Sequence, residues 1–145
     1  MAGLHGKCRG AATLLALLTA APVMASGRIS LPPVTQTFSS HAACVAEMER
    51  LAAGDARQVS PRVMTDETLR EVTLETGGMA RRGPETLRYE ATIWYHNGVF
   101  IRESARFEIS HTFERVVREC AGSTLGITGE KGFTLSTFEP MPEQR

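Results

Sequence analysis

The sequence predicts an α+β domain in which one N-terminal helix packs on an antiparallel meander sheet of about four to five strands. A helical stripe of apolar residues occurs early in the chain, and period-two alternation dominates the later part. The chain has 145 residues, of which 42% are hydrophobic and 22% charged, as is typical of a single globular domain. Its 16 basic and 16 acidic residues balance, so we do not expect the positive surface of a nucleic-acid-binding protein.

Residues 1–25 have the three parts of a secretory signal peptide. Lys7 and Arg9 supply the basic start, residues 11–21 are almost entirely apolar, and small residues precede a cleavage site near Ala25. We therefore expect a periplasmic or secreted protein. No apolar run of about 18 residues occurs after this leader, so no integral membrane span is expected.

Two cysteines, Cys44 and Cys120, remain after the leader is removed. An even pair in an oxidising compartment predicts a single disulfide. Neither cysteine belongs to a metal-binding motif such as C-x-x-C, so we expect no metal site. The bond would tie the helix to the C-terminal part of the sheet.

The first part of the mature chain is expected to hold an extended lead-in and the helix. Residues 26–38 contain a Pro-Pro pair and scattered apolar positions, which indicates a lead-in. Ser39 or Ser40 can cap a helix, Gly54 suits its C-terminal end, and residues 56–67 form a connector. The apolar residues of the helix recur at i, i+4 and i+7 in one stripe: Cys44, Val45, Met48, Leu51 and Ala52.

Period-two alternation predicts three strands, over residues 69–76, 86–95 and 99–109. Asn97-Gly98 favours a two-residue hairpin turn, but that turn would place the apolar residues of its two strands on different faces. A three-residue loop from His96 to Gly98 restores a common face. The same register sets Trp94 opposite Phe100 on the outer face, as a candidate interaction surface.

The C-terminal part has weaker signals. Residues 110–120 match helical spacing but are rich in β-forming residues, so a helix and a long bent strand are both open. A hairpin is expected around residues 129–132, followed by a loose tail at residues 140–145. Residues 39–139 are thus expected to form the single α+β domain.

No motif for nucleotide binding, hydrolysis, metal binding or redox chemistry is present, so we expect neither a cofactor nor an enzyme. His41, His96 and His111 are too widely scattered for a metal motif. Glu103 is the one unusual position, because it is a carboxylate on an otherwise apolar strand face. Glu103 is either a residue at the edge of the sheet or the mouth of a cavity, or a polar group inside a pocket, which makes it a candidate pocket residue.

The segments IWYHNG (from Ile93), FEISHTFER, CAG and ITGEKGFTLSTFEP resemble those of small exported alphaproteobacterial proteins of unassigned function. The resemblance covers the last third of the chain, implies export and a single domain, and brings no catalytic residues. The segments AAGD (from Ala52) and TDE (from Thr65), with one helix before a curved antiparallel sheet, are similar to cystatin and NTF2-like architectures. A shared fold does not determine a function.

These observations lead to two functional hypotheses. The first is an exported, non-enzymatic module that binds an unknown envelope or extracellular protein through Trp94 and Phe100. The alternative is a small-ligand-binding pocket protein or a small enzyme, in which a cone-shaped sheet wraps the helix and Glu103 lines the cavity.

Overall fold

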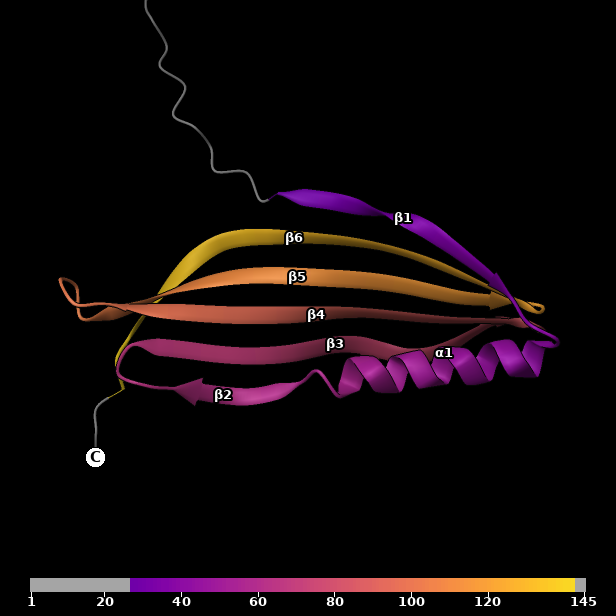
Figure 1. Cartoon of the computed structure of the whole chain (residues 1–145), viewed down its shortest axis with the longest axis horizontal. Coiled ribbons are helices and arrows are strands. Elements are labelled where there is room, and N and C mark those ends of the chain that lie inside the picture. Colours follow the sequence, from indigo (N-terminus) through magenta and orange to yellow (C-terminus); the bar gives the residue numbers. More distant parts are fainter. Residues whose placement is uncertain (1–26, 143–145) are drawn as a thin grey trace, which may run out of the picture.

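The structure is a computed structural model that describes residues 27–142. The predicted signal peptide at residues 1–25, its cleavage site and the end of the predicted tail lie outside the described residues. Within residues 27–142, 69% of the chain is in strands and 14% is in one helix. The elements in chain order are β1 (Arg28–Thr37), α1 (His41–Ala56), β2 (Ser60–Met64), β3 (Thr68–Gly83), β4 (Thr86–Ile101), β5 (Arg106–Ala121) and β6 (Thr124–Pro140) (Figure 1).

The predicted α+β class, with an N-terminal helix on a smaller sheet, is wrong because the fold is mostly β. Its six strands form one antiparallel sheet in the order β1-β6-β5-β4-β3-β2. The segment expected to be a lead-in supplies β1, which pairs with β6 at one edge and precedes the helix. The Pro-Pro pair is tolerated there because an edge strand can lack donors, and the register shifts between Leu31 and Val34.

The turn between β4 and β5 lies later in the chain than predicted. β4 runs through Asn97 and Gly98 without turning and ends at Ile101. The turn falls at residues 102–105, where Ala105 has a φ of 52°. The predicted three-residue loop is therefore wrong, because Gly98 serves the packing of a strand rather than a turn.

Gly98 is required by the close approach of two side chains from the neighbouring strands. A Cβ atom at this position would lie 2.9 Å from the Cβ of Leu69 and 3.3 Å from the Cγ1 of Ile109. Both of these residues are 1% exposed, so neither has room to move into solvent. The absence of a side chain at Gly98 thus lets β3 and β5 pack across β4.

We expect Gly98→Ala to lower the free energy of unfolding by about 1–3 kcal/mol, as overpacking a core usually does. Urea denaturation followed by circular dichroism measures this loss. Gly77→Ala is the matched control, because a Cβ at Gly77 meets no atom within 4 Å. Equal denaturation midpoints for the two variants would contradict the assigned role of Gly98.

Other segments also form longer strands than predicted. The ambiguous residues 110–120 belong to β5, which is a strand because β4 and β6 offer it a ladder on each side. β6 passes through residues 129–132 without the expected hairpin, and β3 continues past Gly77 through a register shift. The predicted connector at residues 56–67 contains β2.

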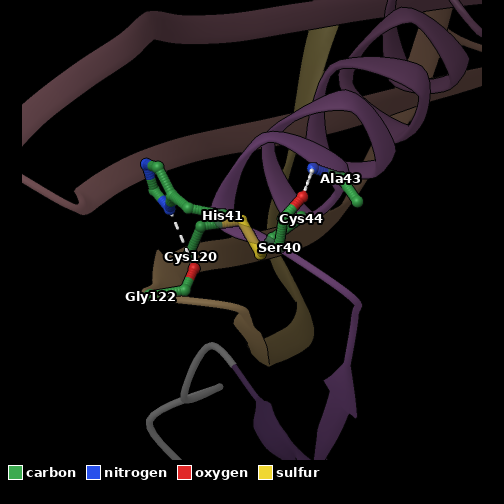
Figure 2. Close-up of a disulfide and its surroundings, with 6 residues drawn as sticks. All are labelled: Ser40, His41, Ala43, Cys44, Cys120 and Gly122. Carbon is green, nitrogen blue, oxygen red and sulfur yellow. Dashed lines mark hydrogen bonds between the residues drawn. A yellow bond between two sulfur atoms is a disulfide. The ribbon is translucent and has the colours of Figure 1, made fainter.

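The helix lies where its stripe predicted, although it continues past Gly54. The side chain of Ser40 caps it by accepting a hydrogen bond from the backbone N–H of Ala43 at 3.2 Å. The predicted disulfide is confirmed: Cys44 of α1 is bonded to Cys120 of β5, with the Cα atoms 6.0 Å apart (Figure 2). Under the helix lies the first core, whose buried members are Cys44, Met48, Tyr89, Ala91, Cys120 and Leu125.

A buried ion pair joins the C-terminal end of α1 to β5. The guanidinium of Arg118 donates hydrogen bonds to the two carboxylate oxygens of Asp55 at 2.5 and 3.1 Å. These side chains are only 9% and 8% exposed, and the Arg118 guanidinium lies 5.4 Å from the centre of the Tyr89 ring. Each charge is therefore neutralised chiefly by the other.

A second core lies on the opposite face, toward the other end of the sheet. Side chains alternate along β5, so Phe107 and Ile109 point away from the face that carries Cys120. The end of β6 bends toward β2 (Figure 1), and Arg62 of β2 forms an ion pair with Glu139 of β6. The second core consists of Leu69, Phe107 and Ile109, with Met64, Phe100 and Met141 packed against them.

Candidate functional site

A hollow on the helix side of the sheet is the candidate functional site. It has a volume of about 390 Å³, within the range of about 300–1,000 Å³ that is usual for ligand pockets. β1, β4, β5 and β6 all contribute to its walls. The residues that line it are Gly27, Arg28, Ile29, Tyr95, Thr112, Phe113, Glu114, Lys131, Gly132 and Phe133.

The hollow exists because the helix is much shorter than the strands beneath it. The 16 residues of α1 rise about 24 Å, whereas the 16 residues of β4 span about 53 Å. Just past the helix, the hydroxyl of Tyr95 donates a hydrogen bond to the side chain of Gln58 at 2.9 Å. Tyr95 therefore marks the border between the covered and the open parts of this face.

Two glycines bring β1 close to the hollow. A Cβ at Gly132 would collide with the Gly27 carbonyl and would lie 2.9 Å from the ring of Phe113. The Gly27 carbonyl instead accepts a hydrogen bond from the backbone N–H of Phe133 at 3.0 Å. The start of β1 thus lies against the Phe133 ring on the side of the hollow and against the Phe113 ring on the opposite face.

The surface of the hollow is largely apolar with a few polar groups. Ile29 is 63% exposed and Phe133 is 52% exposed, so both can contact a ligand without rearrangement. Burial, followed by the negative charges of Glu114 and Asp55, raises the pKa of Tyr95. The Tyr95 hydroxyl therefore remains protonated at neutral pH and keeps its hydrogen bond to Gln58.

The opposite face carries a row of aromatic rings at the middle of the sheet. Trp94 lies 5.2 Å from Phe113 and 6.3 Å from His96, measured between ring centres. His96 in turn lies 4.9 Å from His111. Among residues 27–142, the buried Nε1 of Trp94 has no hydrogen-bond partner.

The structure separates the two residues that were predicted to form an interaction surface. Trp94 pairs with Phe113 of β5 rather than with Phe100. Phe100 packs on Phe107 of the second core, with ring centres 5.3 Å apart. The expected pair does not form because both residues lie on β4, six positions apart.

Glu103, the predicted pocket residue, lies in the exposed turn between β4 and β5. It does not line the hollow. The prediction placed it on a strand because the turn was assigned too early in the chain. Sequence reasoning instead missed Phe133 and Ile29, because their proximity depends on the pairing of the first strand with the last.

Residues 27–142 contain no group of three or more His, Cys, Asp or Glu side chains that could hold a metal ion. The helix in this part of the chain is not long and apolar enough to cross a membrane. The fold and the site thus define the class of this protein. It is a six-stranded antiparallel sheet to which one helix is joined by a disulfide, with an open hollow beside the helix. Comparison with protein families, curated proteins and solved structures finds no match to this chain.

Proposed function

We propose that the protein is an exported, non-enzymatic binding module that holds an apolar small molecule in the hollow beside Tyr95 and Phe133. The observation that carries the proposal is the exposed apolar wall of a hollow of about 390 Å³. A few polar groups in a mainly apolar cavity are typical of small-molecule sites. The disulfide and the predicted signal peptide support a periplasmic or secreted location.

The composition of the rim indicates how a ligand would be oriented. Tyr95 and Thr112 offer hydroxyl oxygens that can accept hydrogen bonds. Lys131 offers a positive charge, and Glu114, its partner on β5, offers a negative one. An apolar body against Phe133 and Ile29, with one polar or anionic group near Lys131, matches the apolar wall and the positive charge. We therefore expect a ligand with an apolar ring or chain and a single polar end.

Docking of an envelope protein is the second candidate function. Leu31 is 39% exposed and Val34 is 54% exposed, and both lie on β1 beside Ile29. Together they extend the apolar wall of the hollow along the edge of the sheet. Exposed apolar surface of this kind often marks a protein contact.

The proposed function predicts that 1-anilinonaphthalene-8-sulfonate, an apolar fluorophore with one anionic group, binds the folded protein at one saturable site. Phe133→Ala should weaken its binding about tenfold, or about 1.4 kcal/mol, because the variant loses part of the apolar wall. A fluorescence titration measures this affinity, and a thermal shift at saturation confirms that the native state is the one that binds.

Val99→Ala is the matched control, because Val99 is a comparably exposed apolar residue at 64% and does not line the hollow. The control should bind the fluorophore as the wild type does. Equal weakening by both substitutions would contradict a site in the hollow. Absence of binding, together with specific cross-linking of β1 to an envelope protein, would favour the docking function instead.

A further inference from the structure

Two histidines face one another on the side of the sheet away from α1. His96 of β4 and His111 of β5 are directly paired, and their Nδ1 atoms are 2.7 Å apart. This distance is a hydrogen bond, so one Nδ1 carries a proton and the other accepts it. The pair cannot keep this contact when both nitrogens are protonated.

The outer nitrogens of the same pair reach the two flanking strands. The Nε2 of His111 lies 2.8 Å from the hydroxyl of Thr137 on β6. The Nε2 of His96 lies 3.4 Å from the hydroxyl of Thr73 on β3. Because a hydroxyl can donate or accept a hydrogen bond, the two threonines allow the histidine pair to be neutral or singly protonated. The two imidazoles thus link the four strands β3, β4, β5 and β6.

The charged groups around the pair come from three further strands. Arg62 of β2, Glu71 of β3 and Glu139 of β6 line a hollow of about 130 Å³ with the two histidines. Arg62 is paired with Glu139. Burial and then the charge of His96 lower the pKa of His111, and the opposing effect of Glu139 is smaller.

The end of β6 is the element that this pair holds. Its pairing with β5 is irregular between Ile109 and His111, and its large side chains there face solvent: Leu135 is 65% exposed and Phe138 is 57% exposed. Few buried contacts therefore retain this segment. The contact of Thr137 with His111 and the ion pair of Glu139 are side-chain links that hold it.

We propose that His96 and His111 form an acid-sensitive latch, in which the second proton separates the two imidazoles and releases residues 134–140 of β6 from β5. Release uncovers Phe107 and Ile109 of the second core. The proton on the imidazole pair comes from solvent and no covalent bond changes. Histidine pairs of this kind respond to mild acid because their charge changes near pH 6.

The direction of the effect is set by the lowered pKa of His111. The unfolded chain takes up this proton at a higher pH than the folded chain does. The stability contributed by the contact between His96 and His111 is thus complete above the unfolded value of about 6.5 and decreases as the pH falls from there toward the lowered folded value of His111.

Hydrogen–deuterium exchange at about pH 7.5 and about pH 5.5, corrected for intrinsic rates, tests the latch. In the wild type, the amides of residues 134–139 should exchange at least tenfold faster at the lower pH, while those of residues 124–128 should not change. His111→Gln keeps a hydrogen-bonding side chain without the titration, so its exchange should be independent of pH. His96→Gln is the second variant and should behave in the same way.

Trp94 provides an independent readout, because it is the one tryptophan of the chain and its ring stacks on His96 at an angle of 6°. Its fluorescence should change between the same two pH values in the wild type. The control His41→Gln should change in the same way, because the His41 imidazole bonds to the Gly122 carbonyl, away from the pair. Wild-type exchange that is equal at both pH values would overturn the proposal. An unchanged pH response in folded His111→Gln and His96→Gln would overturn it as well.

Discussion

Removing the Cys44–Cys120 disulfide should lower the free energy of unfolding by about 4 kcal/mol, because the bond closes a long loop in the unfolded chain. The two cysteines are 76 residues apart, and long loops lose the most entropy on closure. A domain of this size has a total stability of about 5–15 kcal/mol. The disulfide therefore contributes a large share of it.

Urea denaturation of the oxidised protein and of the Cys44→Ala/Cys120→Ala variant measures the contribution of the disulfide. Reduction of the wild type, with the free thiols counted, should produce the same shift. The disulfide joins α1 to β5. Its removal should therefore speed hydrogen exchange, relative to the wild type, more in α1 than in β4. Denaturation midpoints that coincide would contradict a stabilising role.

Asp55→Ala should lower the free energy of unfolding by about 3–5 kcal/mol, because it leaves the buried charge of Arg118 without its partner. The Arg118 guanidinium donates two hydrogen bonds to Asp55 and is 9% exposed. Its Nε already has no partner among the described residues. Loss of the carboxylate thus leaves three buried donor positions with no acceptor.

The double variant Asp55→Ala/Arg118→Met separates the cost of the orphaned charge from the value of the pair. It should recover most of the loss, since an apolar side chain of similar length tolerates this site. Glu47→Ala on the same helix is the control. Its partner Arg50 is exposed, so the control should hardly change the stability. A double variant as unstable as Asp55→Ala would contradict this explanation.

The sequence predicted those features that depend on neighbouring residues. The cap at Ser40 and the apolar stripe of α1 are set by local spacing, and both are present in the structure. The pairing of Cys44 with Cys120 came from counting cysteines in a chain expected to be exported. Each of these features follows from a short stretch of sequence or from one pair of residues, without knowledge of how distant segments pack.

The features that the sequence did not predict depend on contacts between distant segments. Asn97-Gly98 is a strong local hairpin signal, yet Gly98 lies under Leu69 and Ile109 from the two adjacent strands. That error moved Glu103 from an exposed turn into an expected pocket. The hollow was not predicted either, because Phe133 meets the start of β1 only through the pairing of β1 with β6.

The pairing of β1 with β6 also has a consequence for the order in which the protein folds. The residues that pair with β1 begin at Thr124. In a chain that is made from its N-terminus, β1 therefore cannot pair until β6, the last strand, is present. During that interval Ile29, Leu31 and Val34 have no neighbours in the sheet. Contacts this distant in sequence make folding slow and leave apolar strands open to aggregation. β1 is therefore the strand that stays exposed to aggregation until β6 has been made.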